Sequence, residues 1–138
     1  MTYPDLFKEF LSSRDTLRIY RDETPVFSSQ QDRLLPLMEY SANYGSSEKP
    51  VVIFDKIMGN AAALLASRLN CREVYSPLGS ELAVKTLEKY HIQYHLDEVV
   101  PYICRPDGKR MCPMEELSLG KSPEEFYREM KTRISVNH

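Results

Sequence analysis

The residues best placed to do chemistry lie in segment 111–116, Met-Cys-Pro-Met-Glu-Glu, near the C-terminal end of the chain. Proline favours the first position of a helix, because the N–H group that it lacks would be unpaired there. We therefore expect Cys112 to be the N-cap residue and Glu115 to lie in the first turn. Unpaired backbone N–H groups and the positive end of the helix dipole both favour a thiolate at that place. Cys112 is thus a candidate catalytic nucleophile, with Glu115 as its candidate catalytic partner.

A structural alternative exists for this segment. Cys112 can be a small buried residue at a tight turn, and Glu115 and Glu116 can simply complement the dipole of the helix. The other two cysteines are weaker candidates. Cys71 follows the end of an expected helix, where the dipole disfavours a thiolate, and Cys104 lies in an apolar stretch.

A second candidate site follows the run Val51–Phe54, whose β-branched and aromatic residues are typical of a strand buried on both faces. Asp55 and Lys56 come directly after this run, and ligands of open α/β sheets bind beyond the carboxyl ends of strands. Lys56 can hold an anion there, assisted by the start of the next helix and by Gly59, which allows close backbone approach. The alternative is that Asp55 caps that helix and Lys56 is solvated.

The elements that must position these residues follow from the spacing of apolar residues. We expect strands at 16–20, 25–29, 51–54, 72–76 and 92–96, and helices at 3–13, 34–44, 61–66, 80–90, after 112 and from 123. Residues 77–80 are expected to form a turn. Strands that alternate with helices predict an α/β domain with a mostly parallel sheet, covered on both faces, and with the first hairpin as an antiparallel edge.

Composition narrows the class of protein. The 138 residues carry a formal charge of −2, and the short basic run 105–110 is interrupted by Asp107. Nucleic-acid-binding domains are usually clearly basic, so we expect no nucleic acid as partner. We also expect no membrane association, because the chain has no apolar run of about 18 residues. The start has no signal-peptide pattern, and three widely spaced cysteines give no disulfide framework. A cytoplasmic protein is predicted.

Three motifs together resemble a bacterial family of unknown function with a cytidine-deaminase-like fold: Asp-Lys-Ile-Met-Gly-Asn-Ala-Ala-Ala at 55–63, Glu-Val-Tyr-Ser at 73–76 and Cys-Pro-Met-Glu-Glu at 112–116. The resemblance implies a three-layer α-β-α sandwich whose mixed sheet is opened by a β-hairpin. It also implies that the helix starts near residues 60 and 113 face each other, which would bring Cys112, Glu115, Asp55 and Lys56 together. Asn60 and Met114 belong to the same motifs and join Gly59 among the candidate ligand-binding residues.

The chain departs from the zinc deaminases at the metal site. Those enzymes begin one helix with H-x-E and the next with P-C-x-x-C, which hold zinc and the acid/base glutamate. Here the corresponding segments are Asp55-Lys56 and Cys112–Glu115, which lack the histidine and cysteine ligands that zinc favours. We therefore expect no metal and no cofactor. His91, His95 and His138 are expected to be surface or structural residues.

These observations predict one domain over residues 1–138, with the helix in 1–14 and the helix in 121–138 as additions outside the resemblance. The predicted function is binding of a small anionic or nucleotide-like ligand in a pocket between two helix N-termini, without catalytic zinc. One alternative is a metal-independent enzyme that uses Cys112 as an activated thiol. Another is a degenerate zinc-dependent nucleoside or nucleotide deaminase. The nine tyrosines and the amphipathic first helix are compatible with a homo-oligomer, although core packing explains them equally well.

Overall fold

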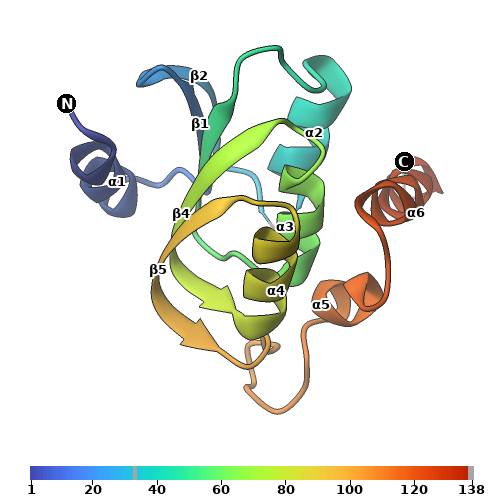
Figure 1. Cartoon of the computed structure of the whole chain (residues 1–138). Helices are drawn as coiled ribbons and strands as arrows, with labels where there is room; N and C mark the ends of the chain where they lie inside the picture. Colours follow the sequence, from blue (N-terminus) through green and yellow to red (C-terminus); the bar gives the residue numbers. More distant parts are fainter. Residues whose placement is uncertain (33, 137–138) are drawn as a thin grey trace.

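A five-stranded mixed sheet in the order β2-β1-β3-β4-β5 forms the centre of the fold (Figure 1). The computed structural model describes residues 1–32 and 34–136. In chain order its elements are α1 (Tyr3–Ser12), β1 (Leu17–Arg21), β2 (Thr24–Ser29), α2 (Leu35–Asn43), β3 (Val51–Asp55), α3 (Asn60–Ala66), β4 (Cys71–Ser80), α4 (Glu81–Lys89), β5 (Gln93–Val100), α5 (Pro113–Ser118) and α6 (Pro123–Val136). β1 is antiparallel to β2 and β3, whereas β3, β4 and β5 are parallel. The predicted α/β fold, with a mixed sheet and an edge hairpin, is confirmed.

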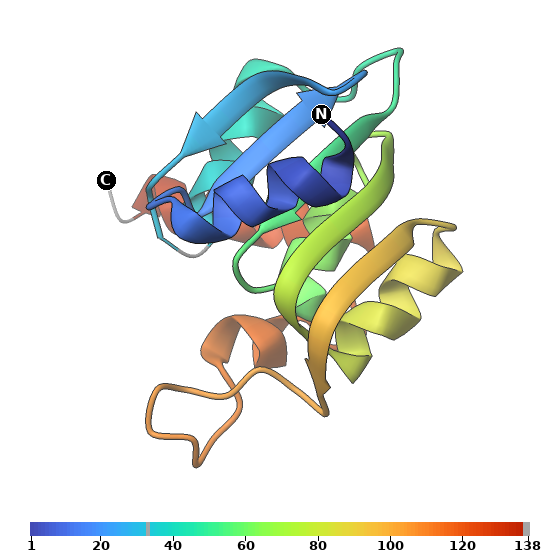
Figure 2. The ribbon, with the colours of Figure 1, turned by 90° about the vertical axis from the view of Figure 1, so that its left-hand side faces the viewer.

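The helices cover the two faces of the sheet unequally. α1 lies alone on one face, and α2, α3 and α4 lie on the other, with α5 and α6 outside α3 (Figure 1). Under α1 a cluster of aromatic residues and one valine fills the interface: Tyr3, Phe7, Phe10, Tyr20, Val52, Phe54 and Tyr75. Figure 2 looks onto this face and shows that α1 crosses the middle of the sheet and leaves β5 uncovered.

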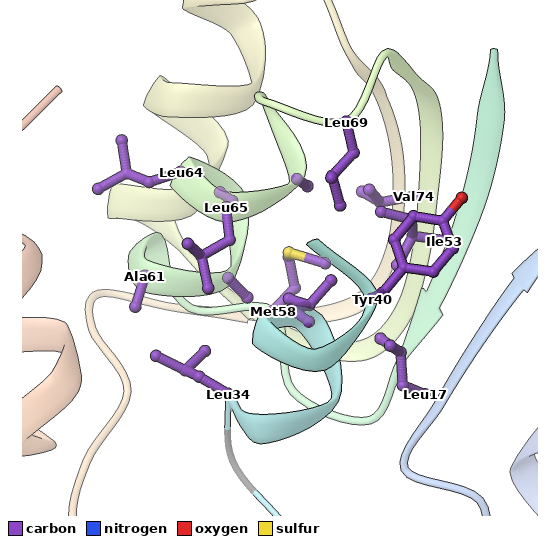
Figure 3. Packing of buried hydrophobic residues seen from close by; sticks show 14 of the residues in the cluster. Leu17, Leu34, Tyr40, Ile53, Met58, Ala61, Leu64, Leu65, Leu69 and Val74 are labelled. Atoms are coloured by element: carbon purple, nitrogen blue, oxygen red, sulfur yellow. The ribbon is translucent and has the colours of Figure 1, made fainter. Parts of the chain in front are cut away.

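The main core lies between the sheet and the other helices, and α3 is its centre (Figure 3). All seven residues of α3 are buried, because the sheet lies below it and α2, α4, α5 and α6 surround it. Its small alanine side chains let these neighbours approach closely. Phe126 of α6 is fully buried in this core, so the C-terminal helix is part of the packed domain.

The predicted turn at residues 77–80 is wrong, because β4 continues to Ser80. A proline within a central strand normally argues against that strand, since it removes one hydrogen-bond donor from the ladder. β3, however, ends at Asp55, before it reaches Pro77. Beyond that point β4 contacts the β3 side only through the isolated bridge between Met58 and Gly79. The proline is tolerated because one neighbouring strand has already ended.

The structure also bears on two predictions from composition. Cys71, Cys104 and Cys112 are all free thiols. Among the described residues, no helix is both long enough and apolar enough to cross a membrane.

Candidate functional site

A buried carboxylate joins the helix starts that the sequence singled out. Glu115 in α5 is only 2% exposed. Its Oε1 atom accepts a hydrogen bond from the backbone N–H of Asn60, the first residue of α3, at 2.5 Å. Its Oε2 atom accepts one from the backbone N–H of Ile103 at 2.7 Å. Through these two hydrogen bonds Glu115 links three segments of the chain: α5, the start of α3 and the backbone at Ile103.

The side chain of Asn60 extends this connection to α5 and α4. Its Nδ2 donates to Ser118 Oγ at 2.9 Å, and its Oδ1 accepts from the hydroxyl of Thr86. Ser118 Oγ also donates to the backbone carbonyl of Glu115 at 2.6 Å. We call Glu115, Asn60, Ser118, Thr86 and the backbone of Ile103 the Glu115 network. Its buried polar groups satisfy one another, which is the condition for a stable polar cluster inside a protein.

Gly59 provides the space in which this network closes. A Cβ atom at residue 59 would lie 3.1 Å from Ile103 Cγ1 and 3.2 Å from Glu115 Oε1. The backbone of Gly59 has an ordinary φ of −84°. The glycine is therefore needed for the close approach of the carboxylate and not for an unusual backbone angle.

The neighbouring residues Asp55 and Lys56 point to opposite faces of the sheet, as successive strand residues do. Lys56 lies on the α1 face, where its Nζ donates to the carbonyl of Ser13 at 3.0 Å and lies 4.8 Å from the centre of the Phe10 ring. A lysine at this place stabilises the C-terminal end of α1. Lys56 is thus directed toward α1, away from the face that carries α3 and α5.

Asp55 lies on the face of the main core, like Val51 and Ile53 in the same strand. Its Oδ1 atom accepts a hydrogen bond from the backbone N–H of Ile57 at 3.3 Å. Burial raises the pKa of Asp55 to about 7, although backbone hydrogen bonds from Ile57 and Lys56 oppose that shift. The structure therefore places Asp55 and Lys56 apart, and it groups Gly59 and Asn60 with Glu115.

Cys112 occupies the N-cap position of α5, as the sequence predicted. The thiol is partly buried and makes no capping hydrogen bond with any described residue. Its backbone N–H donates to the carbonyl of Ile103 at 2.8 Å, so the residue closes the segment that precedes the helix. Activation of this thiol for catalysis stays a prediction. Met114 lines a separate hollow of about 390 Å³ between α5 and α6.

The segment between β5 and α5 forms a hairpin that the spacing of apolar residues does not predict. Arg105 N–H donates to the carbonyl of Arg110 at 2.8 Å, and Gly108 N–H donates back to the carbonyl of Arg105 at 2.8 Å. Gly108 has a φ of +72°, which closes the turn. We call residues 103–112 the basic hairpin. Both views show it reaching beyond the rest of the fold (Figures 1 and 2).

A hollow of about 510 Å³ lies beside this hairpin. Its lining combines three cations with aromatic and apolar side chains and one carboxylate: Tyr102, Arg105, Lys109, Arg110, Met111, Glu116 and Leu119. The composition of the whole chain hides this local charge, because the net value is −2. Three basic residues around a Pro-Asp-Gly turn were the signal that could have revealed it.

The metal chemistry of zinc deaminases can be tested on the side chains that are present. Among residues 1–32 and 34–136, no three His, Cys, Asp or Glu side chains lie close enough together to hold one metal ion. At the starts of α3 and α5 the polar groups are two backbone N–H groups, one carboxylate, an amide, hydroxyls and the single thiol of Cys112, with no histidine and no second cysteine in either helix start. This donor set does not fit a zinc site, because zinc favours thiolate and imidazole ligands.

Comparisons with known proteins agree with this fold. No curated protein matches the chain. A crystal structure of a DUF1893 family protein, TM1506 from Thermotoga maritima, at 2.70 Å resolution, resembles it with a TM-score of 0.85 and 27% sequence identity. The match covers 95% of this chain and 88% of that one. A family model described as TM1506, domain of unknown function (DUF1893), matches residues 6–134, which include most of α1 and nearly all of α6. The chain therefore belongs to the DUF1893 (TM1506) family.

Proposed function

We propose that this protein is a binding module for a small anionic, nucleotide-like ligand, and that the ligand lies in the hollow beside the basic hairpin. The observation that carries the proposal is the lining of that hollow. Arg105, Lys109 and Arg110 contribute three positive charges, against the single carboxylate of Glu116. Arginine side chains suit phosphate and carboxylate groups, because the guanidinium can donate two parallel hydrogen bonds.

The apolar part of the lining supports a ligand that has a flat or apolar portion beside its charge. Tyr102, Met111 and Leu119 line the same hollow. Tyr102 and Leu119 are 39% and 44% exposed, so both side chains are accessible to a ligand. A volume of about 510 Å³ is within the range of small-molecule sites. A nucleotide has this combination of phosphate charge and a stacking base.

The Glu115 network indicates that the helix starts stabilise the site and do not bind the ligand directly. The N–H of Asn60, which an anion would need at the start of α3, already donates to Glu115. The same carboxylate binds the N–H of Ile103 at the base of the basic hairpin. Glu115 thereby fixes the hairpin against the core. We also propose a deaminase-like scaffold whose metal corner has been replaced by this hydrogen-bonded connection.

Isothermal titration calorimetry with ADP, inorganic pyrophosphate and adenosine tests the proposal on the full chain. We expect ADP to bind, pyrophosphate to bind more weakly, and adenosine not to bind measurably. Arg110→Gln should weaken ADP binding about tenfold, which corresponds to one charge-assisted hydrogen bond. Lys85→Gln, which removes an exposed positive charge from α4, is the matched control and should leave the affinity unchanged.

Three outcomes would overturn the proposal. The first is the absence of ADP and pyrophosphate binding at millimolar concentration. The second is an equal effect of Arg110→Gln and Lys85→Gln, which would indicate attraction by net charge alone. The third is a single-stranded oligonucleotide that binds much more tightly than ADP, because it would assign the basic hairpin to nucleic acid.

A further inference from the structure

The two edges of the sheet differ in how they are protected against pairing with another strand. Exposed edges are normally blunted by proline, charged side chains (lysine above all), bulges or short length. At one edge, β2 has six residues, contains Pro25, and its pairing with β1 is irregular between Ile19 and Tyr20. At the other edge, β5 has eight residues, pairs regularly with β4, and contains no proline, lysine or arginine. β5 lacks the proline and the irregular pairing of β2, and its charged side chains are the carboxylates of Asp97 and Glu98.

The exposed side chains of β5 place a histidine and carboxylates in an ordered pattern. His95 stacks on Tyr75 of the cluster under α1, so His95 and Asp97, two residues apart, lie on the α1 face, and both are exposed. α1 does not cover β5 (Figure 2). His95 is held in place, because its Nε2 lies 2.8 Å from Glu73 Oε1 and its ring stacks on Tyr75 with centroids 4.2 Å apart. Val99, further along the same face, is 46% exposed.

We propose that β5 is the interface of a homodimer, in which the β5 strands of two copies pair antiparallel about a two-fold axis perpendicular to the sheet. Such an axis keeps the two faces of the sheet continuous. Residues that face each other across it must therefore lie on the same face of β5. This requirement leaves few registers for the pairing.

One of these registers brings complementary side chains together, because an imidazole N–H can donate a hydrogen bond to a carboxylate. With Leu96 on the two-fold axis, His95 lies opposite the partner's Asp97, and the symmetry forms this pair twice. Moving the axis to residue 97 would place Asp97 opposite the same carboxylate of the second copy, and like charges directly opposite are destabilising. Placing Glu98 on the axis would likewise bring the Glu98 carboxylates of the two copies opposite each other. The sequence of β5 is thus complementary to itself in the register centred on Leu96.

Sedimentation velocity of the full chain at low and high micromolar concentration tests the proposal. We expect a species of twice the 16.0 kDa chain mass that dissociates on dilution. Asp97→Lys should weaken the dimer at least tenfold, because lysine cannot accept a hydrogen bond from the partner's His95 and a lysine on an edge strand disfavours pairing. Glu39→Lys makes the same charge change at an exposed position of α2 and should leave the dissociation constant unchanged.

Hydrogen exchange locates the interface and separates it from any other mode of association. The amides of residues 93–100 should become more protected as wild-type concentration rises, and those of Asp97→Lys should not. Thermal unfolding of Asp97→Lys at low concentration should match the wild type, which excludes misfolding as the cause. A monomer at every concentration, a dimer indifferent to Asp97→Lys, or protection elsewhere than β5 would each overturn the proposal. None of these results depends on ligand binding.

Discussion

Asp55 and Glu115 both carry buried carboxyl groups, yet the two groups differ in their hydrogen-bond partners. Glu115 is 2% exposed and accepts backbone N–H groups from Asn60 and Ile103, which lie in two other segments of the chain. Asp55 is 8% exposed, and the N–H groups that face it belong to the next two residues. One carboxyl group connects distant segments, whereas the other has only local partners.

This difference separates two consequences of burying a carboxyl group. Burial costs free energy unless hydrogen bonds replace the lost water. Glu115 receives these bonds from groups that themselves need acceptors, so folding satisfies donor and acceptor together. Asp55 receives too little compensation, and burial raises its pKa to about 7. The same chemical change, from carboxyl to amide, should therefore have opposite effects at the two positions.

The largest effect is expected at Glu115. Glu115→Ala should lower the free energy of unfolding by about 5 kcal/mol, because two buried N–H groups lose a charged acceptor and a cavity remains. Glu115→Gln should cost about 3 kcal/mol, because its NH₂ group cannot accept a hydrogen bond from an N–H. Urea unfolding followed by circular dichroism measures both values.

Glu116→Gln is the matched control for the Glu115 variants. It makes the identical change one residue later, on an exposed side chain. It should alter the free energy of unfolding by less than about 1 kcal/mol, the range of an exposed charge near a helix start. If Glu115→Gln were as mild as Glu116→Gln, the contrast between the two carboxyl groups would be lost.

At Asp55 the amide should stabilise the protein, and only at higher pH. A carboxyl group whose folded pKa is raised binds its proton more tightly in the folded state. The contribution of Asp55 to the free energy of unfolding is therefore fully present below its unfolded pKa of 3.8. That contribution is lost as the pH rises to the folded pKa of about 7. Asp55→Asn lacks this titration. The difference in unfolding free energy between Asp55→Asn and the wild type should grow in favour of the variant by up to about 4 kcal/mol between pH 4 and 8.

Urea unfolding at several pH values across this window checks the prediction. The asparagine keeps an oxygen that can accept the N–H of Ile57, so the local hydrogen bond survives. Asp32→Asn, at an exposed position before α2, serves as the control and should leave the shape of the pH profile unchanged. A profile for Asp55→Asn that runs parallel to the wild type would show that Asp55 does not titrate in this range.

The sequence predicted the elements well where each signal was local. The apolar run before Asp55 predicted a buried strand, and Cys112 followed by Pro113 predicted the start of α5. The error at Pro77 arose because its tolerance depends on where β3 ends, which is a property of the sheet and not of the segment. Local patterns therefore located the elements but could not locate the end of a neighbouring strand.

The candidate site shows the same limit. The sequence placed Glu115 and Asn60 in two separate motifs, at 112–116 and 55–63, and the structure joins them through a hydrogen bond. Asp55 and Lys56 are as close in sequence as residues can be, yet strand geometry directs them to opposite faces. Ile103 contributes only its backbone N–H to the network, so its side-chain type carried no signal. Proximity in space required the fold.

Ser118→Ala tests how far the Glu115 network extends, and its effect should be the smallest. The change removes the nearer acceptor of Asn60 Nδ2, which keeps the Ser118 carbonyl at 3.5 Å, and it removes the donor to the carbonyl of Glu115. It should cost about 1–2 kcal/mol, the range of a buried hydrogen bond that leaves one partner unsatisfied. Ser67→Ala is the control, because that hydroxyl donates only to the carbonyl of Ala63 in its own helix.

Combining Ser118→Ala with each carboxyl variant makes the test specific to the network. In the double variant with Glu115→Gln, the loss of unfolding free energy should differ from the sum of the two single losses by at least about 0.5 kcal/mol. The reason is that Glu115 and Ser118 both bind Asn60. Paired with Asp55→Asn, which shares no hydrogen-bond partner with Ser118 among the described residues, the two effects should add. Additivity in both cycles would mean that Glu115 binds its two N–H groups independently, and that Asn60 and Ser118 form a separate contact between α3 and α5.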